Sequence, residues 1–440
     1  MHFYEAVMSV FKRDIFIYCL TILVSIIVAR TLGPEILGIW VALSLISQYA
    51  DFFGRLKTDL ASVPLIGKQE FSVERILFIN NIIAITSSFF LVVLLFIFQD
   101  YLLYNLLNIS SSDYKIVYLL ILVCIPVEFL LSVYKYYFLG TDDINFYNKI
   151  NVTVNIVNFA LIILCLLILD LELLGVVIAK LISTLWALGI SIIRVHIFDK
   201  KQFYSFAPSK NLFKKLALGA TGFYISSLLT NLFEISYKTV GALFLAKANL
   251  AFFNQAESLS RMLIKLSESV SVVLYPKISH LSDLNAAIKL TVLSFKALIF
   301  IQVLLSIPLI IFAKPLIIFL YGVEFSDVAI FIKFMIFPFV FFSAVNVFKI
   351  HIEGQGKAHV IPKLIIAPVL ISLLISYVLV KNFGVSGLLL SFIFGYSLYS
   401  FILLIYALRF LSIPFNRLLL NKEDFKMFKE YIFQLIGYEK

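Results

Sequence analysis

Long apolar runs follow one another along most of this 440-residue chain, and they limit the folds that it can adopt. A bilayer hydrocarbon core about 30 Å thick requires roughly 20 apolar residues per spanning helix. Runs of this length lie near 14–30, 35–54, 76–98, 116–139, 149–169, 173–194, 216–237, 248–272, 289–313, 328–350, 361–381 and 384–408. The sequence therefore predicts an all-α integral membrane protein with twelve transmembrane helices.

Composition supports this class, because 62% of the residues are hydrophobic and only 14% are charged. A soluble domain needs a larger charged share to cover its surface. The three cysteines, Cys19, Cys124 and Cys165, lie inside apolar runs and have no spacing suited to zinc or to a disulfide framework. We expect them to be small buried hydrophobic residues.

Basic residues between the runs predict the orientation, since short loops rich in Lys and Arg stay in the cytoplasm. With the N-terminus inside, the inner side carries Lys12, Arg13, Arg55, the connector 198–215 and the tail 409–440. We therefore expect both termini in the cytoplasm. The net charge of +10 is explained by this topology and by anionic headgroups, so nucleic acid is not an expected partner.

The two halves of the chain resemble each other. With a shift of about 213 residues, "RTLGPEILGIW" at 30–40 aligns with "LFLAKANLAFF" at 243–253. Further matches pair Pro64 with Pro276, Gly140 with Gly354, and the segment 172–177 with 384–389. The chain is therefore interpreted as a duplication.

Each half holds six spans, an even number, so the halves enter the membrane in the same direction and form two parallel-related bundles. The predicted domains are an N-terminal six-helix bundle at 1–205, a C-terminal six-helix bundle at 206–410 and a cytoplasmic amphipathic tail at 411–440. An interfacial helix in the tail would carry one apolar face, made of Phe425, Phe428, Tyr431, Ile432 and Leu435.

Gly33 and Pro34 fall between the first two spans. Glycine and proline in sequence are typical of a tight turn. We expect a turn here, on the outer side, with an equivalent turn in the second half.

Polar residues recur at steps of three or four within several spans, which places them on one helical face. The second span carries Ser44, Gln48, Asp51, Arg55, Asp59 and Ser62, and the eighth carries Asn254, Glu257, Arg261, Lys265 and Glu268. Similar stripes comprise Glu128, Ser132 and Lys135; Asn148, Asn151, Asn155 and Asn158; and Ser227, Thr230, Asn231, Glu234 and Lys238. The sixth span carries one charged residue, Lys180. Charges at membrane depth are costly and usually face a bundle interior or a water-filled cavity. The stripes therefore predict a polar central lumen.

A simpler interpretation remains open for individual residues. Asp51 with Arg55, and Glu257 with Arg261, are spaced as helical neighbours and could neutralise each other in a packed interface. The five histidines have no metal-ligand spacing, and "GQGKAH" at 354–359 lacks the pattern of a phosphate loop.

The Arg-x-Leu-Gly-Pro-Glu-x-x-Gly turn at 30–38, "FFNQAESL" at 252–259 and "YPKIS" at 275–279 carry a family resemblance. With the duplication, they resemble the Wzx-type O-antigen flippases of the multidrug/oligosaccharidyl-lipid/polysaccharide (MOP) exporter superfamily. The resemblance implies two six-helix bundles around a V-shaped lumen that opens alternately to each side. It also implies a transporter, not an enzyme, in the bacterial inner membrane.

The implied substrate is an undecaprenyl-diphosphate-linked oligosaccharide, moved from the cytoplasmic to the periplasmic leaflet for O-antigen or a related polysaccharide. A diphosphate needs cationic partners, for which we expect Arg30, Arg55, Lys135, Lys180, Arg261 and Lys265. Sugars need amide groups, for which we expect Gln48, Asn151, Asn155, Asn158 and Asn231. Carboxylates that could couple transport to H⁺ or Na⁺ are Asp51, Glu128, Glu234 and Glu257. No other cofactor is expected.

Three alternatives stay open at this point. A multidrug transporter or a lipid II-type transporter of the same superfamily would share the fold. The lipid II branch has cations in its first span, whereas the first span of this chain has only Arg30, near its end. A membrane polysaccharide polymerase would need a sizeable outer loop, which the topology does not provide. A polymerase and a chain-length regulator are candidate protein partners.

Overall fold

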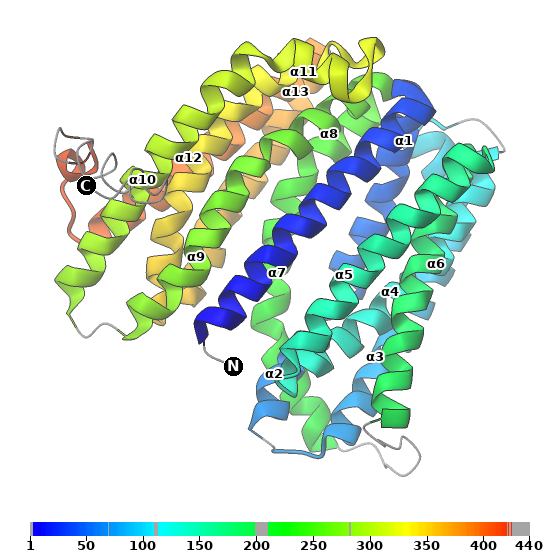
Figure 1. Cartoon of the computed structure of the whole chain (residues 1–440), viewed down its shortest axis with the longest axis horizontal. Helices are drawn as coiled ribbons and strands as arrows, with labels where there is room; N and C mark the ends of the chain where they lie inside the picture. The colour runs from blue at the N-terminus through cyan, green and yellow to red at the C-terminus, as the bar shows by residue number, and fades with distance from the viewer. Residues whose placement is uncertain are drawn as a thin grey trace. The chain divides into compact units, whose positions relative to one another are not determined.

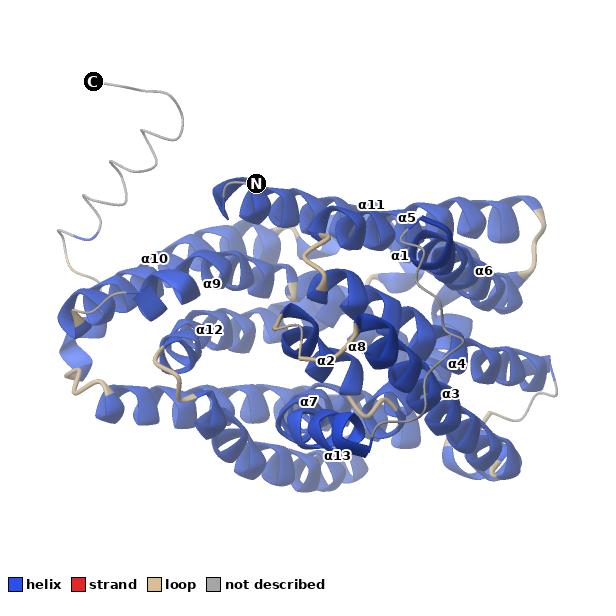
Figure 2. Ribbon diagram, turned by 90° about the horizontal axis from the view of Figure 1, so that it is seen from below, coloured by secondary structure: helices blue, strands red, loops and turns tan. Residues whose placement is uncertain are grey.

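A computed structural model of the chain describes residues 3–68, 70–109, 113–198, 210–280, 283–419, 421 and 424. All regular elements in these residues are helices (Figures 1 and 2). The first part contains α1 (Phe3–Gly54), α2 (Thr58–Gly67), α3 (Val73–Ile97), η1 (Tyr101–Leu106), α4 (Asp113–Gly140), α5 (Ile144–Ile162), η2 (Ile163–Ile168), α6 (Glu172–Ile193), η3 (Arg194–Phe198) and α7 (Lys210–Phe244). The second part contains α8 (Lys247–Ser260), α9 (Met262–His280), α10 (Leu284–Ile311), α11 (Ala313–Tyr321), η4 (Val323–Phe325), α12 (Val328–Gly354), η5 (Ala358–Val360), α13 (Ile361–Phe410) and η6 (Phe415–Leu418).

The helices confirm the predicted class of twelve-span membrane protein. Within the described residues, nine helical stretches are long and apolar enough to cross a membrane. Two of them, α1 and α13, each hold two spans that meet at a glycine, Gly33 and Gly384. The successive helices α8 and α9 form the remaining span, which is divided in two and is therefore not one long apolar helix.

The predicted turn after the first span is present at Gly33. This residue has φ 69° and ψ 173° inside α1, a conformation that glycine adopts readily because it has no Cβ. Pro34 then begins the next helical stretch, where its missing N–H costs no hydrogen bond. The second half breaks at the aligned position, since α7 ends at Phe244 and α8 begins at Lys247.

Two glycine contacts are repeated in the two halves, as a duplication requires. Gly140 ends α4, and a Cβ added there would lie 2.9 Å from the side chain of Ile66. Gly354 ends α12, and a Cβ added there would lie 3.0 Å from the side chain of Ile278. Both isoleucines follow the aligned prolines of the sequence repeat by two residues. The same close approach of two helices therefore occurs once in each half.

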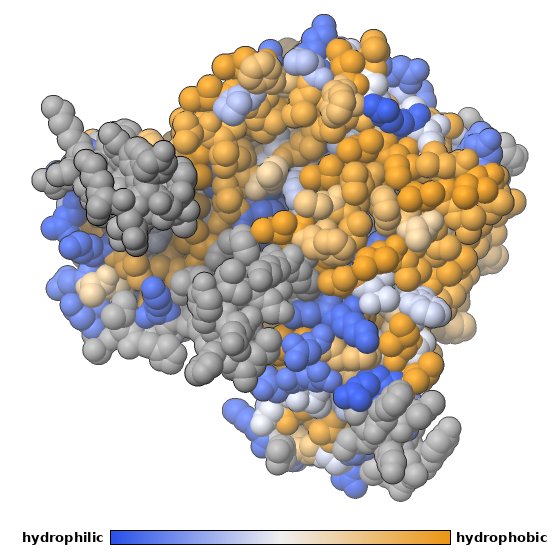
Figure 3. Space-filling model, in the orientation of Figure 1, coloured by the Kyte–Doolittle hydropathy of each residue, from blue (hydrophilic) through white to orange (hydrophobic). Residues whose placement is uncertain are grey.

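Among the nine apolar stretches of the described residues, those of α4 and α12, the fourth span of each half, have the most buried windows. In α4, 56% of the most apolar window is buried, and in α12 the share is 61%. Around them, α4 packs against α2, α3 and α6, whereas α12 packs against α9, α10 and α13. Large side chains such as Phe89 and Phe90 of α3 and Phe337 of α12 are exposed on the outside of these helices. On the face in Figure 3, hydrophobic residues cover most of the described helices, as expected for surfaces in contact with lipid.

The packing of the helices divides the chain into two compact units. Unit 1 comprises 1–252 with 320–324, and unit 2 comprises 253–319 with 325–440. The sequence repeat instead put a domain boundary between residues 205 and 206, which lie outside the described residues. The division by packing assigns α7 to unit 1, although α7 opens the second repeat.

The predicted tail, 411–440, is described only to residue 419 and at 421 and 424. Asn421 and Asp424 form a capping box, since each side chain accepts a hydrogen bond from the other's backbone N–H, at 2.8 and 2.9 Å. The Asp424 carboxylate also pairs with Lys296 of α10 at 2.7 Å. The residues proposed for the apolar tail face, from Phe425 onwards, lie outside the described residues.

Candidate functional site

The residues singled out from the sequence fall in both units, and each unit is described by itself. Unit 1 holds Arg30, Gln48, Asp51, Arg55, Glu128, Lys135, Asn151, Asn155, Asn158, Lys180, Asn231 and Glu234. Unit 2 holds Glu257, Arg261 and Lys265.

In unit 1, a network of charges surrounds the break between α1 and α2. Arg55 follows the end of α1, and its Nη1 lies 2.9 Å from Asp51 Oδ1. The Nζ of Lys57 lies 3.0 Å from Asp51 Oδ2, and Arg55 Nε lies 3.6 Å from Asp59 Oδ2. Ser132 of α4 donates a hydrogen bond to the same oxygen of Asp59. Two cations and two carboxylates therefore balance one another here.

Backbone geometry explains how Lys57 enters this network. It has φ 57° and ψ 22°, which ends the helical path and turns its side chain back toward Asp51, six residues earlier. Only 4% of Lys57 is exposed. Burial lowers the pKa of Lys57, and the Arg55 guanidinium lowers it further, while Asp51 opposes both effects.

A cavity of about 10 Å³ adjoins this network, between Arg55, Asp59 and Asn80 of α3. Such a volume is the room for roughly one water molecule. Arg55 Nε and Asn80 Oδ1 are both buried without a hydrogen-bond partner. Water in this cavity is a candidate hydrogen-bond partner for these buried atoms.

A second ionic cluster joins three helices of unit 1. Lys180 Nζ of α6 lies 2.6 Å from Glu128 Oε1 of α4. Ser47 of α1 donates to Glu128 Oε2 at 3.1 Å and accepts from Lys180 at 3.3 Å. Both charged side chains are about one-third exposed, at 35% and 28%. A predicted substrate cation and a predicted coupling carboxylate are thus partners of each other.

The amide side chains are tied to their own helices through their nitrogens. Asn151 donates to Tyr147 O at 3.0 Å, and Asn155 donates to Asn151 O at 2.8 Å. Asn231 donates to Ser227 Oγ at 3.0 Å, and Gln48 donates to Ser44 at 3.3 Å. These bonds use the nitrogen of each amide, and the carbonyl oxygen takes no part in them.

Arg30 lies at the end of the first span, as predicted, and contacts the end of another helix. Its Nε donates to the backbone oxygen of Leu320, at 2.8 Å, within the last turn of α11. The last carbonyls of a helix lack intrahelical partners and carry a partial negative charge. Arg30 therefore acts as a C-terminal cap of α11 in this structure.

In unit 2, Arg261 lies at the break between α8 and α9. Its Nε donates to Glu257 Oε1 at 2.9 Å, and its Nη2 donates to the Tyr396 hydroxyl at 3.3 Å. The guanidinium carbon lies 5.9 Å from the centre of the Phe339 ring, within the range of a cation–π contact. Glu257 is 1% exposed, whereas 29% of the Arg261 side chain is exposed. The guanidinium is thus held from several sides, while part of the side chain is exposed.

Aromatic rings support this arginine. Phe339 meets Phe392 and Tyr396 edge-to-face, with ring centres 5.2 and 5.0 Å apart, and Phe253 meets Phe392 in the same way at 5.6 Å. These four residues are nearly completely buried. Because such packed rings have few alternative positions, they fix the hydroxyl and the ring face that contact Arg261.

The other predicted residues are partly buried or exposed. Lys265 pairs with Glu268 at 2.6 Å, and about half of each side chain is exposed. Lys135, Asn158 and Glu234 are half-buried on α4, α5 and α7. Both helical-neighbour pairs considered from the sequence, Asp51 with Arg55 and Glu257 with Arg261, are formed.

Some members of these clusters were not identified from the sequence. Lys57 and Ser47 were outside the predicted stripes, and Tyr396 and Phe339 lie within apolar runs that give no sign of a polar role. Only the break after Gly54 could have signalled Lys57, and the sequence marks that break weakly. Within the described residues, no three His, Cys, Asp or Glu side chains could together hold a metal ion.

Comparison with known families finds one match that covers most of the chain. Residues 7–282 match the profile of a family described as polysaccharide biosynthesis protein. A comparison with curated protein sequences found no match.

Solved structures with the same fold are distant in sequence. An inward-facing multidrug resistance transporter of the MATE family, in the MOP superfamily, shares 14% identity, covers 90% of this chain and 94% of its own, and gives a TM-score of 0.75. The lipid II flippase MurJ, in an inward closed conformation, shares 16% identity over 97% of this chain and 99% of its own, with a TM-score of 0.70. A MOP superfamily transporter from Pyrococcus furiosus, described by the reverse polarity of its binding pocket, shares 14% identity over 93% and 96%, with a TM-score of 0.66. These similarities confirm the fold predicted for the chain.

Proposed function

Because the chain belongs to the family of polysaccharide biosynthesis proteins, we propose that it is a flippase for undecaprenyl-diphosphate-linked oligosaccharides. It moves these units from the cytoplasmic to the periplasmic leaflet by alternating access, for O-antigen or a related surface polysaccharide. The fold shared with a lipid II flippase and with MATE transporters supports a transporter, and the family supports a substrate in polysaccharide synthesis.

The observation that carries this proposal is the environment of Arg261. A guanidinium at membrane depth is costly unless it has a partner and a function. Here Glu257 and Tyr396 orient it while part of the side chain stays open. A planar guanidinium binds phosphate oxygens through parallel hydrogen bonds, which suits a diphosphate.

In this proposal, the remaining cations bind the diphosphate more weakly than Arg261 does. Arg55 and Lys180 are balanced by Asp51 and Glu128, so a diphosphate must compete with these carboxylates for them. Lys135, Lys265 and Arg30 provide further positive charge along the path. The carbonyl oxygens of Gln48, Asn151, Asn155, Asn158 and Asn231 accept hydrogen bonds from sugar hydroxyls.

Coupling to H⁺ or Na⁺ belongs to the same proposal, with Asp51, Glu128, Glu234 and Glu257 as candidate carboxylates. Glu128 is the strongest of them because it is partly exposed and has a cationic partner that an anionic substrate would attract away. The protein resides in the bacterial inner membrane with both termini in the cytoplasm. A polymerase and a chain-length regulator are its proposed protein partners.

A multidrug transporter is the second candidate, because the MATE structure has the same fold. The arginine held by Tyr396 and Phe339 favours an anionic substrate over a cationic drug. Reduced drug resistance in cells without the gene, with unchanged polysaccharide, would support this second function.

The test uses cells that lack the gene and make a lipid-linked oligosaccharide. A periplasmic sugar-modifying enzyme reports which lipid-linked units have reached the outer leaflet. We expect intact units to accumulate out of reach of the reporter, and the restored gene to make them accessible. Modified but unpolymerised units would overturn the flippase proposal in favour of a polymerase.

A further inference from the structure

The helix α12 of unit 2 carries polar residues that the proposed function does not use. Phe342, Asn346 and Lys349 are half-buried and follow one another at steps of four and three, on one helical face. Between Phe342 and Lys349, every residue other than Asn346 is buried. Lys349 Nζ lies 3.9 Å from Glu353 Oε1, in a partly exposed pair. Phe342, Asn346 and Lys349 together form the α12 stripe.

The α12 stripe faces away from the lipid side of its helix. Phe337, which is 72% exposed, and Phe334, which is 52% exposed, mark the lipid side. At about 3.6 residues per turn, Asn346 lies roughly two and a half turns after Phe337, and therefore on the opposite face. Polar side chains within a membrane span face a bundle interior or water. The partly exposed surface of the stripe is thus suited to polar ligands and not to lipid chains.

The equivalent face of α4 in unit 1 is also polar. The shift that aligns the two helix ends, Gly140 and Gly354, aligns the α12 stripe with Glu128, Ser132 and Lys135 of α4, in that order. Both repeats therefore place polar residues on the same face of their fourth span.

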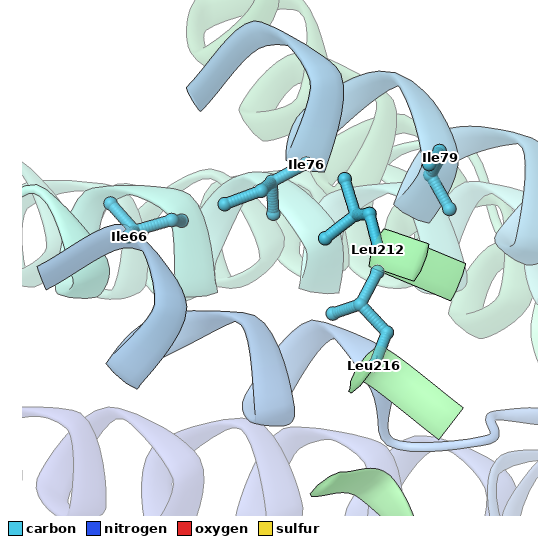
Figure 4. Packing of buried hydrophobic residues seen from close by; sticks show 5 residues of the cluster. All are labelled: Ile66, Ile76, Ile79, Leu212 and Leu216. Carbon is cyan, nitrogen blue, oxygen red and sulfur yellow. The ribbon is translucent and has the colours of Figure 1, made fainter. Parts of the chain in front are cut away.

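Apolar packing supports this register in unit 1. Gly140 packs against Ile66 of α2, which belongs to a buried cluster with Ile76, Ile79, Leu212 and Leu216 (Figure 4). The end of α4 cannot shift along α2 without disturbing this close packing. The matching contact at Gly354 fixes the end of α12 in the same way.

In unit 1, charged partners within the protein engage this face. Glu128 pairs with Lys180 at 2.6 Å. Ser132 is 6% exposed and donates a hydrogen bond to Asp59. These polar groups of α4 are thus already bound to strong partners inside unit 1.

In unit 2, the aligned positions have different partners. An aromatic ring, Phe342, takes the place of the carboxylate, and it meets the Tyr396 ring edge-to-face with centres 5.2 Å apart. Asn346 donates to Ser267 Oγ of α9 at 3.5 Å, which is long for a hydrogen bond. The α12 stripe therefore presents a partly exposed ring beside an amide that its internal contact engages weakly.

Buried hydrogen bonds hold the ring in place. Ser343, next to Phe342, accepts from Gln302 Nε2 of α10 at 2.6 Å and donates to Leu263 O of α9 at 3.2 Å. Gln302 also donates to Leu263 O at 3.0 Å, and both polar side chains are completely buried. Such networks rigidify the helices that they join. The position of Phe342 is thus fixed relative to Leu263, which follows Arg261 by two residues.

The α12 stripe continues the Arg261 site along the helix. The ring of Phe339 contacts the guanidinium, and Tyr396 contacts both Arg261 and Phe342. At about 1.5 Å per residue, Phe342 and Asn346 lie about 5 and about 10 Å beyond Phe339 along the helix axis. The proposed orientation places this end of α12 on the cytoplasmic side, from which the substrate enters.

We propose that Phe342 and Asn346 bind the oligosaccharide of the substrate, at the sugar that follows the diphosphate held by Arg261. This rests on the proposed flippase function and adds a sugar site in unit 2 to it. The C–H groups of a sugar ring pack on the negatively polarised face of an aromatic ring. An amide can donate to and accept from sugar hydroxyls. The two residues therefore distinguish a lipid diphosphate that carries sugars from one that does not.

Binding to the purified full chain in nanodiscs tests the proposal. Two probes are compared: the lipid-linked oligosaccharide extracted from cells lacking the gene, and undecaprenyl diphosphate without sugar. Phe342→Ala and Asn346→Ala are the test variants, and Phe342→Tyr keeps the ring. Phe337→Ala, on the lipid side of the same helix, is the matched control. Thermal unfolding midpoints confirm that each variant is folded.

We expect the wild-type protein to bind the lipid-linked oligosaccharide at least about tenfold more tightly than the sugar-free lipid. Phe342→Ala and Asn346→Ala should each lower this preference about five- to tenfold, as expected for one ring contact or one hydrogen-bonded amide. Their affinity for the sugar-free lipid should stay within about twofold of the wild-type value. Phe342→Tyr and Phe337→Ala should keep the preference.

Equal affinity of the wild-type protein for both probes would overturn the sugar site. Equal losses for both probes in Phe342→Ala would also overturn it, because the ring would then act only through Arg261. Wild-type protein that binds neither probe would refute the proposed function, and the sugar site with it.

A photoreactive side chain tests the contact in a variant that keeps an aromatic ring. Benzoylphenylalanine is placed at the position of Phe342 or, as the control, of Phe337, and the protein is irradiated with the lipid-linked oligosaccharide. A lectin specific for the oligosaccharide detects the adduct. We expect labelling from the first position and none from the second. Equal labelling from both positions, or none from the first, would contradict the proposal.

Discussion

At the scale of single residues, most charges inside this protein occur in compensated clusters. Asp51 and Asp59 balance Arg55 and Lys57 at one helix break, and Glu257 balances Arg261 at another. Ion pairs that are removed from water lose hydration, so each one persists only with good geometry and further hydrogen bonds. The pairs differ in exposure, and this difference predicts which of them substitution will affect.

Arg261→Ala is predicted to lower export of lipid-linked units about tenfold or more. The reason is that hydrogen bonds to charged groups contribute roughly 1.5–3 kcal/mol, and about 1.4 kcal/mol corresponds to tenfold. Lys265→Ala on the same span is the matched comparison and should lose at most about fivefold, because exposed pairs contribute about 0–1 kcal/mol and about 1.4 kcal/mol corresponds to tenfold. Export is measured in complemented deletion cells at equal protein levels.

Arg261→Lys separates charge from geometry. Lysine keeps the positive charge but cannot make the two directed bonds to Glu257 and Tyr396. We expect an intermediate loss. Equal export by the alanine and lysine variants of Arg261 and by Lys265→Ala would refute a substrate role for Arg261.

At the scale of elements, close helix contacts and breaks determine where the charged residues lie. Gly38 allows α1 to touch the backbone of Lys247. Gly387 lies close to the backbone oxygen of Leu379, on the other side of the kink at Gly384 in α13, and a Cβ added at Gly387 would overlap this oxygen. Gly33 and Gly384 divide α1 and α13 into two spans each. The ends of α1 and α8 each precede an arginine, as expected since helix C-termini favour cations.

Gly38→Ala is predicted to destabilise the protein, because its Cβ would overlap a backbone atom that cannot rotate away. Overpacking typically costs about 1–3 kcal/mol. Gly67→Ala is the matched control, since nothing lies within 4 Å of a Cβ at that helical position. Thermal unfolding in detergent should show a lower midpoint for the first variant and an unchanged or higher one for the second. The reverse order would contradict the contact between α1 and Lys247.

The segment after α13 is also held by one buried contact. Asp424→Asn removes the partner of Lys296, whose side chain is 9% exposed, and breaking a buried pair costs about 3–5 kcal/mol. We expect a clear fall in the unfolding midpoint, whereas Glu268→Gln in the exposed pair with Lys265 should have little effect. Equal midpoints for both variants would argue against a buried ion pair between Asp424 and Lys296.

The ion pair between Asp424 and Lys296 also predicts that the stability of the fold depends on pH. Burial alone would raise the pKa of Asp424, but hydrogen bonds from Lys296 and Asn421 outweigh it and hold the pKa of this carboxyl below its usual value. A carboxyl with a lowered folded-state pKa stabilises the fold above its unfolded pKa of about 3.9 and loses this effect as the pH falls through the folded value. The difference in midpoint between the wild-type protein and Asp424→Asn should therefore shrink below about pH 4. A difference that grows on acidification would refute the assignment.

At the scale of the whole molecule, the chain has a duplicated sequence and a structure that divides elsewhere. The most buried apolar windows lie in the fourth span of each half, and Gly140 and Gly354 make equivalent contacts with isoleucine. Unit 1 nevertheless includes α7 and the segment 320–324. The two halves thus share local packing, whereas contacts between residues far apart in the chain determine which helices form one compact unit.

Topology gives the prediction at this scale. An alkaline phosphatase fused after Lys440 should be inactive, because the enzyme folds only in the periplasm and the proposed orientation places this end in the cytoplasm. The same enzyme inserted near Asn108, between α3 and α4, should be active. Activity of the C-terminal fusion would reverse the proposed orientation and with it the direction of transport.

The sequence by itself determined the membrane class, the twelve spans, the duplication and the turn at Gly33, because apolar length and glycine–proline chemistry are local properties. It also identified Arg55, Arg261 and their helical partners, since residues four apart share a helical face. Only the tertiary structure decided that Lys180 pairs with Glu128, that Tyr396 and Phe339 hold Arg261, and that α7 packs with the first bundle. Such contacts join positions far apart in the chain, and their partners depend on how helices pack, which no local pattern of residues specifies.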